Sequence, residues 1–372
     1  MALDAPQIVF AGGGTGGHLF PALAVADEMR LRHPSASIWF IGARRGLEQR
    51  LVPRAGYTLR SLGLSGIKGR GPVGRLVAGA AAGWAVLRCL FWLLAARPDL
   101  VIGVGGYASG PAVLAATLLR LKTMVMEQNH YPGATNRWLA PRVDEVCVPS
   151  DAARERLGGR GVVTGNPVRS EFTRIGEPTL GPVPSVLVFG GSRGAHSINV
   201  AMGQAVERLA RTDAPPRICH QTGAEDESSV IEAYRGYPEE RREVLAFIDD
   251  MPARLAAADL VVCRAGASTL SELAAAGRAA ILVPYPHAAD DHQRHNAETM
   301  QSAGAAVVLR DAELDGERLA QRIVELTGDR DRLRAMGRAA RQLGRPRATS
   351  AIAGVAEALI AGGSAERGAD VS

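Results

Sequence analysis

The fold is decided near the start of the chain, in the stretch Ile8-Val9-Phe10-Ala11-Gly12-Gly13-Gly14-Thr15-Gly16-Gly17-His18, which an apolar segment with helical spacing, residues 19–31, follows directly. This order predicts a buried strand, a turn almost free of side chains, and a helix. Such a turn lets backbone N–H groups and the N-terminus of the helix approach an anion closely. The chain has three turns of this type, which indicates a protein that handles phosphate esters.

The length of 372 residues, with 47% hydrophobic and 22% charged residues, predicts two globular domains. The formal net charge is +5 and is carried mainly by arginine. A basic balance suits an anionic substrate, a nucleic acid or an anionic membrane surface. Nucleic acid is the least favoured of the three, because aromatic residues make up only 5% of the chain and no arginine run is interleaved with them.

Four cysteines are scattered along the chain, at Cys89, Cys147, Cys219 and Cys263. They form no Cys-x-x-Cys pair and have no histidine at ligand spacing. Neither structural zinc nor disulfides are therefore predicted, and a reducing cytoplasm fits. The first residues lack the cationic segment and apolar core of a secretory signal.

Short β-rich runs alternate with longer helical patterns, and their continuous apolar character predicts parallel sheets covered by crossover helices. The expected strands are residues 8–11, 37–41, 100–104, 123–127, 145–148, 185–189, 217–221, 243–247, 260–263, 280–283 and 306–309. Residues 186–195 repeat the opening strand, glycine turn and helix, and residues 176–184 are typical of a linker. The predicted fold class is α/β, with two doubly wound domains that face each other across a cleft.

The segment 75–96 is the most apolar part of the chain, and it has three interpretations. A transmembrane span is disfavoured, because Arg88 would lie near its middle at a cost of about 2.5–3.5 kcal/mol. A buried crossover helix is the second interpretation. An interfacial helix is the third; its apolar stripe would consist of Trp84, Leu87, Phe91 and Leu94, and its preceding cations of Lys68, Arg70 and Arg75.

A glycine-rich turn is also typical of dinucleotide-dependent oxidoreductases, where an acid at the end of the second strand holds the ribose. Here that strand ends in Ile41-Gly42-Ala43-Arg44-Arg45. The missing acid disfavours a dehydrogenase, although the arginines leave NADP open. The turn at residues 103–111 is a second candidate phosphate cradle, or a turn needed only for tight packing of strand against helix.

Residues 263–272, Cys263-Arg264-Ala265-Gly266-Ala267-Ser268-Thr269-Leu270-Ser271-Glu272, predict a strand end and a helix whose first turn exposes amides and hydroxyls. That first turn is a candidate seat for a diphosphate. Glu272 follows Ser268 by one helical turn and could accept both hydroxyls of an attached ribose. A capping box with Ser268 or Thr269 at the helix N-terminus is the alternative.

A further loop places several metal-ligand types close together, at His287, Asp290, Asp291, His292 and His295. A metal site is one interpretation of this pattern. The neighbouring Gln293, at the expected start of a helix, instead favours hydrogen bonds to sugar hydroxyls.

Seven motifs occur in the order typical of one family: Gly13–His18, Gly105-Gly106-Tyr107, Glu127-Gln128-Asn129, Gly165-Asn166-Pro167-Val168-Arg169, Gly190-Gly191-Ser192, Phe247-Ile248-Asp249-Asp250-Met251 and Gly266–Glu272. Together they closely resemble the MurG glycosyltransferases, which convert lipid I to lipid II in peptidoglycan synthesis. The resemblance runs from about Ile8 to about Leu359. It implies a GT-B fold: a first, membrane- and acceptor-facing domain at residues 1–168, a UDP-GlcNAc domain at 169–345, a C-terminal helix at about 346–363 that returns to the first domain, and a disordered tail at 364–372.

By analogy with this family, UDP-GlcNAc binding falls to Thr15, Gly16, Gly17, Asn129, Arg169, Ser192, Ile248, Ala267, Ser268, Thr269, Leu270, Ser271, Glu272 and Gln293. Within this set, Ser192 and the turn 267–269 would hold the diphosphate and Glu272 the ribose. The backbone of Ile248 would bind uracil, and Gln293 and Asn129 the GlcNAc hydroxyls. The residues implied to face the acceptor are Gly13, Gly14, His18, Gly105, Gly106, Tyr107 and Ser109.

The implied reaction is an inverting displacement, which needs a base for the acceptor hydroxyl and a site that stabilises the charge of the leaving group. His18 is the candidate base, because a helix N-terminus favours neutral imidazole; the alternative is that His18 only positions the acceptor. Glu127 is a second catalytic candidate. We expect no metal and no cofactor, since the helix N-terminus at residues 267–269 can stabilise the leaving diphosphate.

The implied partners are UDP-GlcNAc, the lipid I acceptor, the anionic cytoplasmic membrane surface and other proteins of cell-wall synthesis. The implied location is peripheral, on the cytoplasmic face of the cell membrane. Three other functions remain open: a UDP-GlcNAc 2-epimerase, a diacylglycerol glycosyltransferase and a nucleotide-binding module without catalysis.

Overall fold

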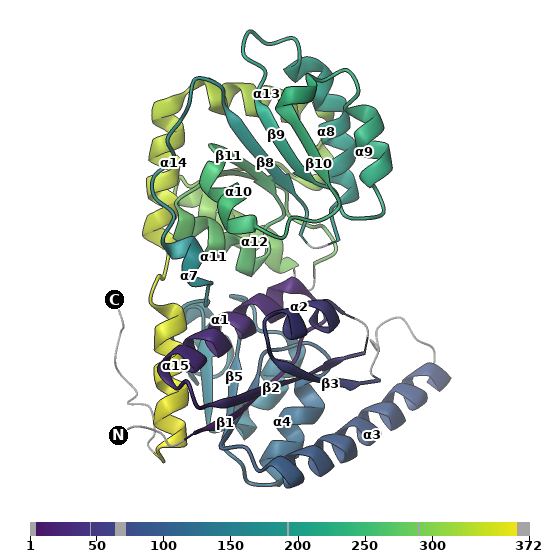
Figure 1. Ribbon diagram of the computed structural model, residues 1–372, viewed down its shortest axis with the longest axis vertical. Helices are drawn as coiled ribbons and strands as arrows, with labels where there is room; N and C mark the ends of the chain where they lie inside the picture. The colour runs from purple at the N-terminus through teal and green to yellow at the C-terminus, as the bar shows by residue number, and fades with distance from the viewer. Residues whose placement is uncertain (1–4, 45, 64–71, 192, 289–290, 363–372) are drawn as a thin grey trace. The chain divides into compact units, whose positions relative to one another are not determined.

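A computed structural model describes residues 5–44, 46–63, 72–191, 193–288 and 291–362 (Figure 1). The chain divides into two compact units, one of Met1–Arg169 with Pro346–Ser372 and the other of Ser170–Arg345. The tail expected to be disordered, residues 364–372, lies outside the described residues.

A seven-stranded parallel sheet forms the centre of the first unit, in the order β3-β2-β1-β4-β5-β6-β7. Its strands are β1 (Gln7–Ala11), β2 (Ser37–Ala43), β3 (Thr58–Leu62), β4 (Leu100–Gly103), β5 (Thr123–Met126), β6 (Glu145–Val148) and β7 (Val162–Val163). Successive side chains of β1 alternate between two hydrophobic cores, with Ile8 and Phe10 in one and Val9 and Ala11 in the other. This alternation explains the continuous apolar run, because both faces of the sheet are covered.

Helices cover both faces of this sheet. They are α1 (Gly16–Arg32), α2 (Glu48–Arg54), α3 (Pro72–Ala96), α4 (Ser109–Leu118), α5 (Ala134–Leu139), α6 (Asp151–Arg156) and α15 (Ala348–Ile360), with a short 3-10 turn, η1 (Ala140–Arg142). The core on one face contains buried side chains of α1 and α15. The core on the other face contains buried side chains of α3 and α4.

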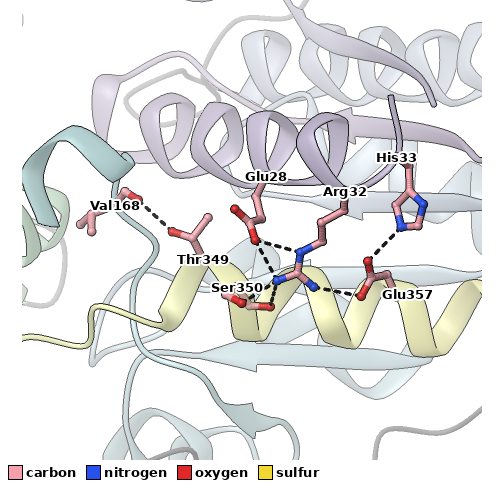
Figure 2. A network of polar contacts seen from close by, with 7 residues as sticks. All are labelled: Glu28, Arg32, His33, Val168, Thr349, Ser350 and Glu357. Carbon is pink, nitrogen blue, oxygen red and sulfur yellow. Dashed lines mark hydrogen bonds and ion pairs between the residues drawn. The ribbon is translucent and has the colours of Figure 1, made fainter. Parts of the chain in front are cut away.

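Helix α15, from the end of the chain, lies along α1 and is held by a polar network as well as by its apolar face (Figure 2). Arg32 of α1 donates to Glu357 of α15 at 2.9 Å and to Glu28 of its own helix at 2.8 Å. His33 lies 2.9 Å from the other oxygen of Glu357. At the start of α15, the Thr349 hydroxyl donates to the carbonyl of Val168.

Helix α3 buries one side and exposes the other. Ala85, Cys89 and Leu93 are buried in the core beneath it. The opposite stripe is exposed by more than half: Trp84 67%, Leu87 58%, Phe91 71% and Leu94 55%. The interpretation of α3 as an ordinary buried crossover helix is therefore wrong for this stripe. Lys68 and Arg70, expected before it, lie outside the described residues.

Among the described residues, one helical window, Gly79–Ala96, is long and apolar enough to cross a membrane by length and composition alone. Only 17% of that window is buried. A single window of this kind is weak evidence for a span. If α3 crossed a bilayer, it would also remove Ala85, Cys89 and Leu93 from the core of the first unit.

A six-stranded parallel sheet forms the centre of the second unit, in the order β10-β9-β8-β11-β12-β13. Its strands are β8 (Ser185–Phe189), β9 (Arg217–Gln221), β10 (Arg242–Leu245), β11 (Leu260–Cys263), β12 (Ala279–Leu282) and β13 (Ala306–Val308). Its helices are α7 (Ser170–Thr173), α8 (His196–Leu209), α9 (Glu227–Ala233), α10 (Met251–Ala257), α11 (Ala267–Ala276), α12 (His292–Ser302), α13 (Gly316–Gly328) and α14 (Arg330–Leu343), with 3-10 turns η2 (Glu239–Arg241) and η4 (Asp311–Glu313). Buried residues of α8 and α13 join the strands in its core.

Candidate functional site

Two glycine turns of the first unit meet at the point where the strand order reverses, between β1 and β4. The amide of Gly13 donates to the carbonyl of Gly105 at 3.3 Å. A Cβ on Gly12 would lie 2.3 Å from Gly105 O, and one on Gly106 would lie 2.4 Å from Gly13 O. The two backbones are thus in direct contact, which explains why side chains are absent. In open α/β sheets this edge is the usual ligand site.

His18 lies beside these turns, in the first turn of α1. A Cβ on Gly105 would lie 2.9 Å from His18 Cε1, so the imidazole packs against this glycine. Its Nδ1 lies 2.9 Å from Oε1 of Gln128. The residue before the helix, Thr15, is exposed and makes no side-chain capping hydrogen bond. Gly16 and Gly17 are the first two residues of the helix.

An acid that the sequence analysis missed reaches the first glycine turn. Glu48, in the first turn of α2, is 1% exposed, and its carboxylate accepts the amides of Gly14 and Ala43, each at 2.9 Å. β2 itself ends without an acid, as expected, but the carboxylate of Glu48 on the next helix reaches the amide of its last residue, Ala43. This carboxylate is enclosed by glycine backbone, since a Cβ on Gly46 would lie 2.3 Å from it. The amide of Gly14 is consequently occupied rather than offered to a phosphate.

Glu127 is a buried structural carboxylate, which corrects its assignment as a catalytic candidate. It is 2% exposed and accepts five hydrogen bonds. Oε1 accepts the amides of Gln128 and Asn129 and the side chain of Asn129, while Oε2 accepts the amide of Gly133 and the side chain of Asn136. A carboxylate with both oxygens so engaged shapes its loop and is not free to take a proton from substrate.

The residues expected to face the acceptor differ in exposure. Tyr107 is 57% exposed beside the second glycine turn. Ser109, in contrast, is fully buried, and its hydroxyl has no hydrogen-bond partner within the described ranges. A Cβ on Gly103 would lie 2.7 Å from that hydroxyl. The side chain of Ser109 is therefore packed inside the turn, and its assignment to acceptor contact is corrected.

In the second unit, the N-terminus of α11 follows β11 at the corresponding reversal of strand order. The N-cap residue is Gly266, which makes no side-chain capping hydrogen bond, so neither Ser268 nor Thr269 occupies the N-cap position. The alternative of a capping box at Ser268 or Thr269 is therefore wrong. The first amide inside the ladder is that of Leu270, which donates to Gly266 O. The amides of residues 267–269 precede this ladder, as the first amides of any helix do, and a helix N-terminus of this kind can bind an anion.

Side chains after this turn have distinct roles. Ser271 donates to the carbonyl of Ala267 at 2.9 Å, so its hydroxyl is engaged within the helix. Leu270 is buried, with 8% exposure. Glu272 is half-buried, one turn beyond Ser268. Ser192, expected to hold the diphosphate with this turn, lies outside the described residues.

Gln293, at the start of α12, braces the loops that flank α11. Its Oε1 accepts the amide of Ala265 at 3.2 Å and that of Tyr285 at 3.0 Å. Because the oxygen faces two donors, the side-chain NH₂ is left to donate elsewhere. Within the described part of the chain, that NH₂ has no hydrogen-bond acceptor. Asn296, one turn further, donates to the carbonyl of Ala265.

The amide of Ile248, expected to bind uracil, already donates to Oε1 of Gln221 at 3.0 Å. Gln221 also donates to the carbonyl of Gly191 at 2.8 Å and is 2% exposed. It therefore ties the glycine turn after β8 to the loop that carries Ile248. A polar residue at the end of a buried strand was the available signal for this missed residue.

Arg169 and Asn129, two further residues expected to contact UDP-GlcNAc, lie in the first unit. The Arg169 guanidinium carbon lies 5.1 Å from the ring centroid of Phe20 on α1. Asn129 donates its side-chain amide to Glu127 at 3.1 Å, which leaves its Oδ1 for hydroxyl donors.

No group of three or more His, Cys, Asp or Glu side chains suited to a metal ion occurs among the residues that the structure describes. In the loop considered for a metal, Asp291 pairs with Arg294, and His295 lies 3.6 Å from Glu298. Asp290 lies outside the described ranges.

Family models match both halves of the chain. Residues 8–148 match the glycosyltransferase family 28 N-terminal domain, and residues 185–352 match the family 28 C-terminal domain. With two parallel α/β units and glycine turns at both strand reversals, the chain is a GT-B glycosyltransferase.

Curated relatives narrow the class. A Syntrophotalea carbinolica protein is 46% identical over 91% of this chain and 94% of its own, and a Myxococcus xanthus protein is 43% identical over 95% and 93%. Both are named UDP-N-acetylglucosamine–N-acetylmuramyl-(pentapeptide) pyrophosphoryl-undecaprenol N-acetylglucosamine transferase. The crystal structure of Acinetobacter baumannii MurG has a TM-score of 0.74 and 30% identity, covering 95% of this chain and 99% of that one. The chain belongs to the MurG family.

A more distant similarity confirms only the fold. A UDP-N-acetylglucosamine 2-epimerase structure from Listeria monocytogenes, described as putative in its title, has a TM-score of 0.67 at 15% identity and covers 96% of each chain. The dehydrogenase hypothesis has no support in these matches, since both halves fit a glycosyltransferase family.

Proposed function

We propose that this enzyme transfers GlcNAc from UDP-GlcNAc to the C4 hydroxyl of MurNAc in undecaprenyl-pyrophosphoryl-MurNAc-pentapeptide, and so converts lipid I to lipid II in peptidoglycan synthesis. The names of relatives that are 42–46% identical over most of the chain support this reaction. Because the donor linkage is α and the product is β-1,4, a single displacement at the anomeric carbon inverts the configuration.

The uncapped N-terminus of α11 is the observation on which the donor site depends. The amides of Ala267, Ser268 and Thr269 would bind the diphosphate, and the positive end of the helix would stabilise the charge that develops on UDP. Glu272 lies one turn further along the same helix and would accept the ribose hydroxyls. Ser192 would complete the diphosphate site from the turn after β8.

Three amide groups would orient the uracil base and the GlcNAc ring of the donor. The carbonyl of Ile248 would accept from uracil, because its amide is engaged by Gln221. The side-chain NH₂ of Gln293 and the Oδ1 of Asn129 would bind GlcNAc hydroxyls. The buried side chain of Leu270 and the engaged hydroxyl of Ser271 would support the helix rather than touch the donor.

His18 would take the proton of the acceptor hydroxyl, as the part-buried imidazole beside the two glycine turns of the first unit. Tyr107 and the backbone of Gly105, Gly106 and Gly13 would face the acceptor. An alternative is that His18 only positions the acceptor. The reaction would proceed without a metal, because the α11 N-terminus supplies the positive potential that the leaving group needs.

A membrane-docking surface would bring the enzyme to its lipid-linked acceptor at the cytoplasmic face. We define the α3 stripe as Trp84, Leu87, Phe91 and Leu94, all more than half exposed. A cavity of about 200 Å³ adjoins it, lined by Arg44, Arg88 and Trp84 among others. Apolar rings beside arginine suit an anionic interface.

The direct test measures transfer of labelled GlcNAc to lipid I, with diacylglycerol and water as competing acceptors. Product on lipid I alone is expected. UDP-ManNAc formed without acceptor would instead identify an epimerase, and transfer to diacylglycerol would identify a different transferase. UDP binding without turnover would identify a nucleotide-binding module without catalysis. Activity in excess EDTA checks the proposed independence of metal.

The donor site is tested by Glu272→Ala, which should weaken UDP affinity by about 10-fold or more, as expected for a lost charge-assisted hydrogen bond. Glu325→Ala is the matched control, because this exposed α13 carboxylate forms ion pairs with Arg322 and Arg332 on the surface of the second unit. Unchanged affinity in Glu272→Ala, measured by calorimetry, would contradict the proposed site.

The membrane surface is tested by co-sedimentation with phosphatidylglycerol vesicles. Phe91→Ser combined with Leu87→Ser should release the protein from vesicles while leaving transfer to a detergent-dispersed acceptor intact. Ile231→Ser, which removes an exposed apolar side chain of α9, is the control. Retained vesicle binding in the double variant would exclude the α3 stripe.

A further inference from the structure

The orientation of one buried amide decides which nitrogen of His18 carries a proton. Gln128 is 2% exposed, and its side-chain nitrogen lies 3.2 Å from the carbonyl oxygen of Met126. A carbonyl oxygen can only accept, so the group facing it must be the NH₂. Oε1 is therefore the atom that faces His18.

An amide oxygen is likewise only an acceptor. His18 Nδ1, 2.9 Å from Oε1 of Gln128, must then be the protonated nitrogen. In the neutral ring, Nε2 keeps an unshared electron pair. No hydrogen-bond partner faces Nε2 among the residues that the structure describes, and this nitrogen is not among the buried unpartnered polar atoms.

Gln128 is itself held in place by the carboxylate of the preceding residue, Glu127. Its backbone amide donates to Glu127 Oε1 at 2.9 Å, and the four other donors on that carboxylate fix the loop. Gly105 packs against the Cε1–Nδ1 edge of the imidazole, where a Cβ would come within 2.9 Å of Cε1 and 3.0 Å of Nδ1. The ring is thus set by Gln128 and Gly105 before any substrate binds.

The carboxylates on the neighbouring elements are also engaged. Glu127, after β5, is saturated by its five donors, and Glu48, on α2, accepts the amides of Gly14 and Ala43. The direct partner of His18 Nδ1 is a neutral amide, which accepts a hydrogen bond but takes no proton.

We propose that Gln128 is a positioning residue that holds His18 as the Nδ1–H tautomer and so leaves Nε2 as the proton acceptor. The catalytic part rests on the proposed function. In the step, the acceptor O4–H proton moves to Nε2 while O4 bonds to the anomeric carbon. The bond from that carbon to the phosphate oxygen breaks, and its electron pair leaves with UDP. The imidazolium keeps donating Nδ1–H to Gln128.

The tautomer is measured directly by long-range ¹H–¹⁵N NMR on the full chain labelled at histidine. His18 is assigned by the signal missing in His18→Gln. We expect the Nδ1–H pattern for His18 in the free protein. An Nε2–H pattern in the wild type would overturn the proposal without any activity measurement.

Variants at Gln128 test the consequence. Gln128→Leu removes the acceptor, so the ring should revert to the Nε2–H form that predominates for the neutral histidine side chain in water, and kcat should fall between about 10- and 10³-fold with KM little changed. Gln128→Glu restores an acceptor that carries charge. It should keep the Nδ1–H form, exceed the Leu variant in kcat, and move the acidic limb of the pH–rate profile to higher pH, because a carboxylate stabilises the imidazolium.

Gln49→Leu is the matched control. Gln49 also donates its side-chain amide to a backbone carbonyl of the first unit, that of Ala43 at 2.7 Å, and its other partner is the Ser61 hydroxyl rather than His18. It should leave tautomer and kcat unchanged. A kcat of Gln128→Leu within threefold of wild type would overturn the proposal. If the tautomer is Nδ1–H but lipid I receives no GlcNAc, the proposed function fails and the tautomer assignment stands.

Discussion

Two histidines, one in each unit, show how similar hydrogen bonds give different roles. His18 donates from Nδ1 to the amide oxygen of Gln128. His220, on β9, lies with Nε2 3.1 Å from Oδ1 of Asn199 and with Nδ1 3.0 Å from the hydroxyl of Tyr234. Asn199 donates its NH₂ to Thr222 and Asp226, so its oxygen must accept from His220 Nε2–H.

The difference lies in burial and in a spare nitrogen. His220 is fully buried and uses both nitrogens, and its desolvation lowers its pKa to about 3. It is thus a neutral structural group. His18 is only part-buried and commits one nitrogen to the protein. A histidine with one bound nitrogen at the edge of a ligand turn is equipped for proton transfer, whereas one with both bound is equipped for packing.

The largest expected effect comes from His18→Gln, which should lower kcat by about 10²–10⁴-fold, the usual contribution of a general base. The thermal midpoint should change little, because the side chain is part-buried and polar. Initial-rate kinetics with lipid I measure the effect. A kcat within a few-fold of wild type would show that His18 only positions the acceptor.

His220→Phe should show the opposite pattern. It leaves the Asn199 oxygen and the Tyr234 hydroxyl without a buried partner, so we expect a loss of about 2–4 kcal/mol in the free energy of unfolding. The kcat of the folded protein should stay unchanged. Urea unfolding measures the loss, with His295→Phe on the exposed face of α12 as control. A stability equal to wild type would contradict the assigned network.

The pH dependence of stability sharpens the comparison. In the unfolded chain His220 binds a proton below pH 6.5, but the folded state resists protonation until about pH 3. Stability should therefore fall as the pH decreases below 6.5, by about 2 kcal/mol between pH 7 and pH 5 from this group alone. His220→Gln should flatten that slope in urea titrations at several pH values. An unchanged slope would show that His220 does not control it.

The smallest effect is expected at a third histidine. His33 Nε2 lies 2.9 Å from Glu357 Oε1 between α1 and α15, where the two side chains are 13% and 29% exposed. His33→Gln should cost only about 0.5–1 kcal/mol, because a partly solvated polar contact between two side chains contributes little. Thermal unfolding measures this. A loss above that of His220→Phe would reverse the ranking.

The sequence predicted the central strands well, because each is a continuous apolar run between two covered faces. It missed β3 and β7. β3 (Thr58–Leu62) is the edge strand of its sheet and contains Arg60 and Ser61, so no such run marks it. β7 (Val162–Val163) has two residues, too few for a pattern.

The parts of the candidate site that are formed by backbone could be predicted from the sequence. The buried side chains that support those parts could not be predicted as well. The glycine turns and the start of α11 follow from local sequence. Glu48 returns to the first turn through α2, a contact that spans 34 residues. The saturation of Glu127 and the burial of Ser109 depend on packing that spacing alone does not reveal.

The backbone contact between the turns after β1 and β4 also limits how the enzyme can be redesigned. Because Gly12 meets Gly105 and Gly106 meets Gly13 with no room for a methyl group, neither loop can be diversified alone. A library aimed at a new acceptor should vary both loops as one unit, or keep all four glycines and diversify the exposed Tyr107.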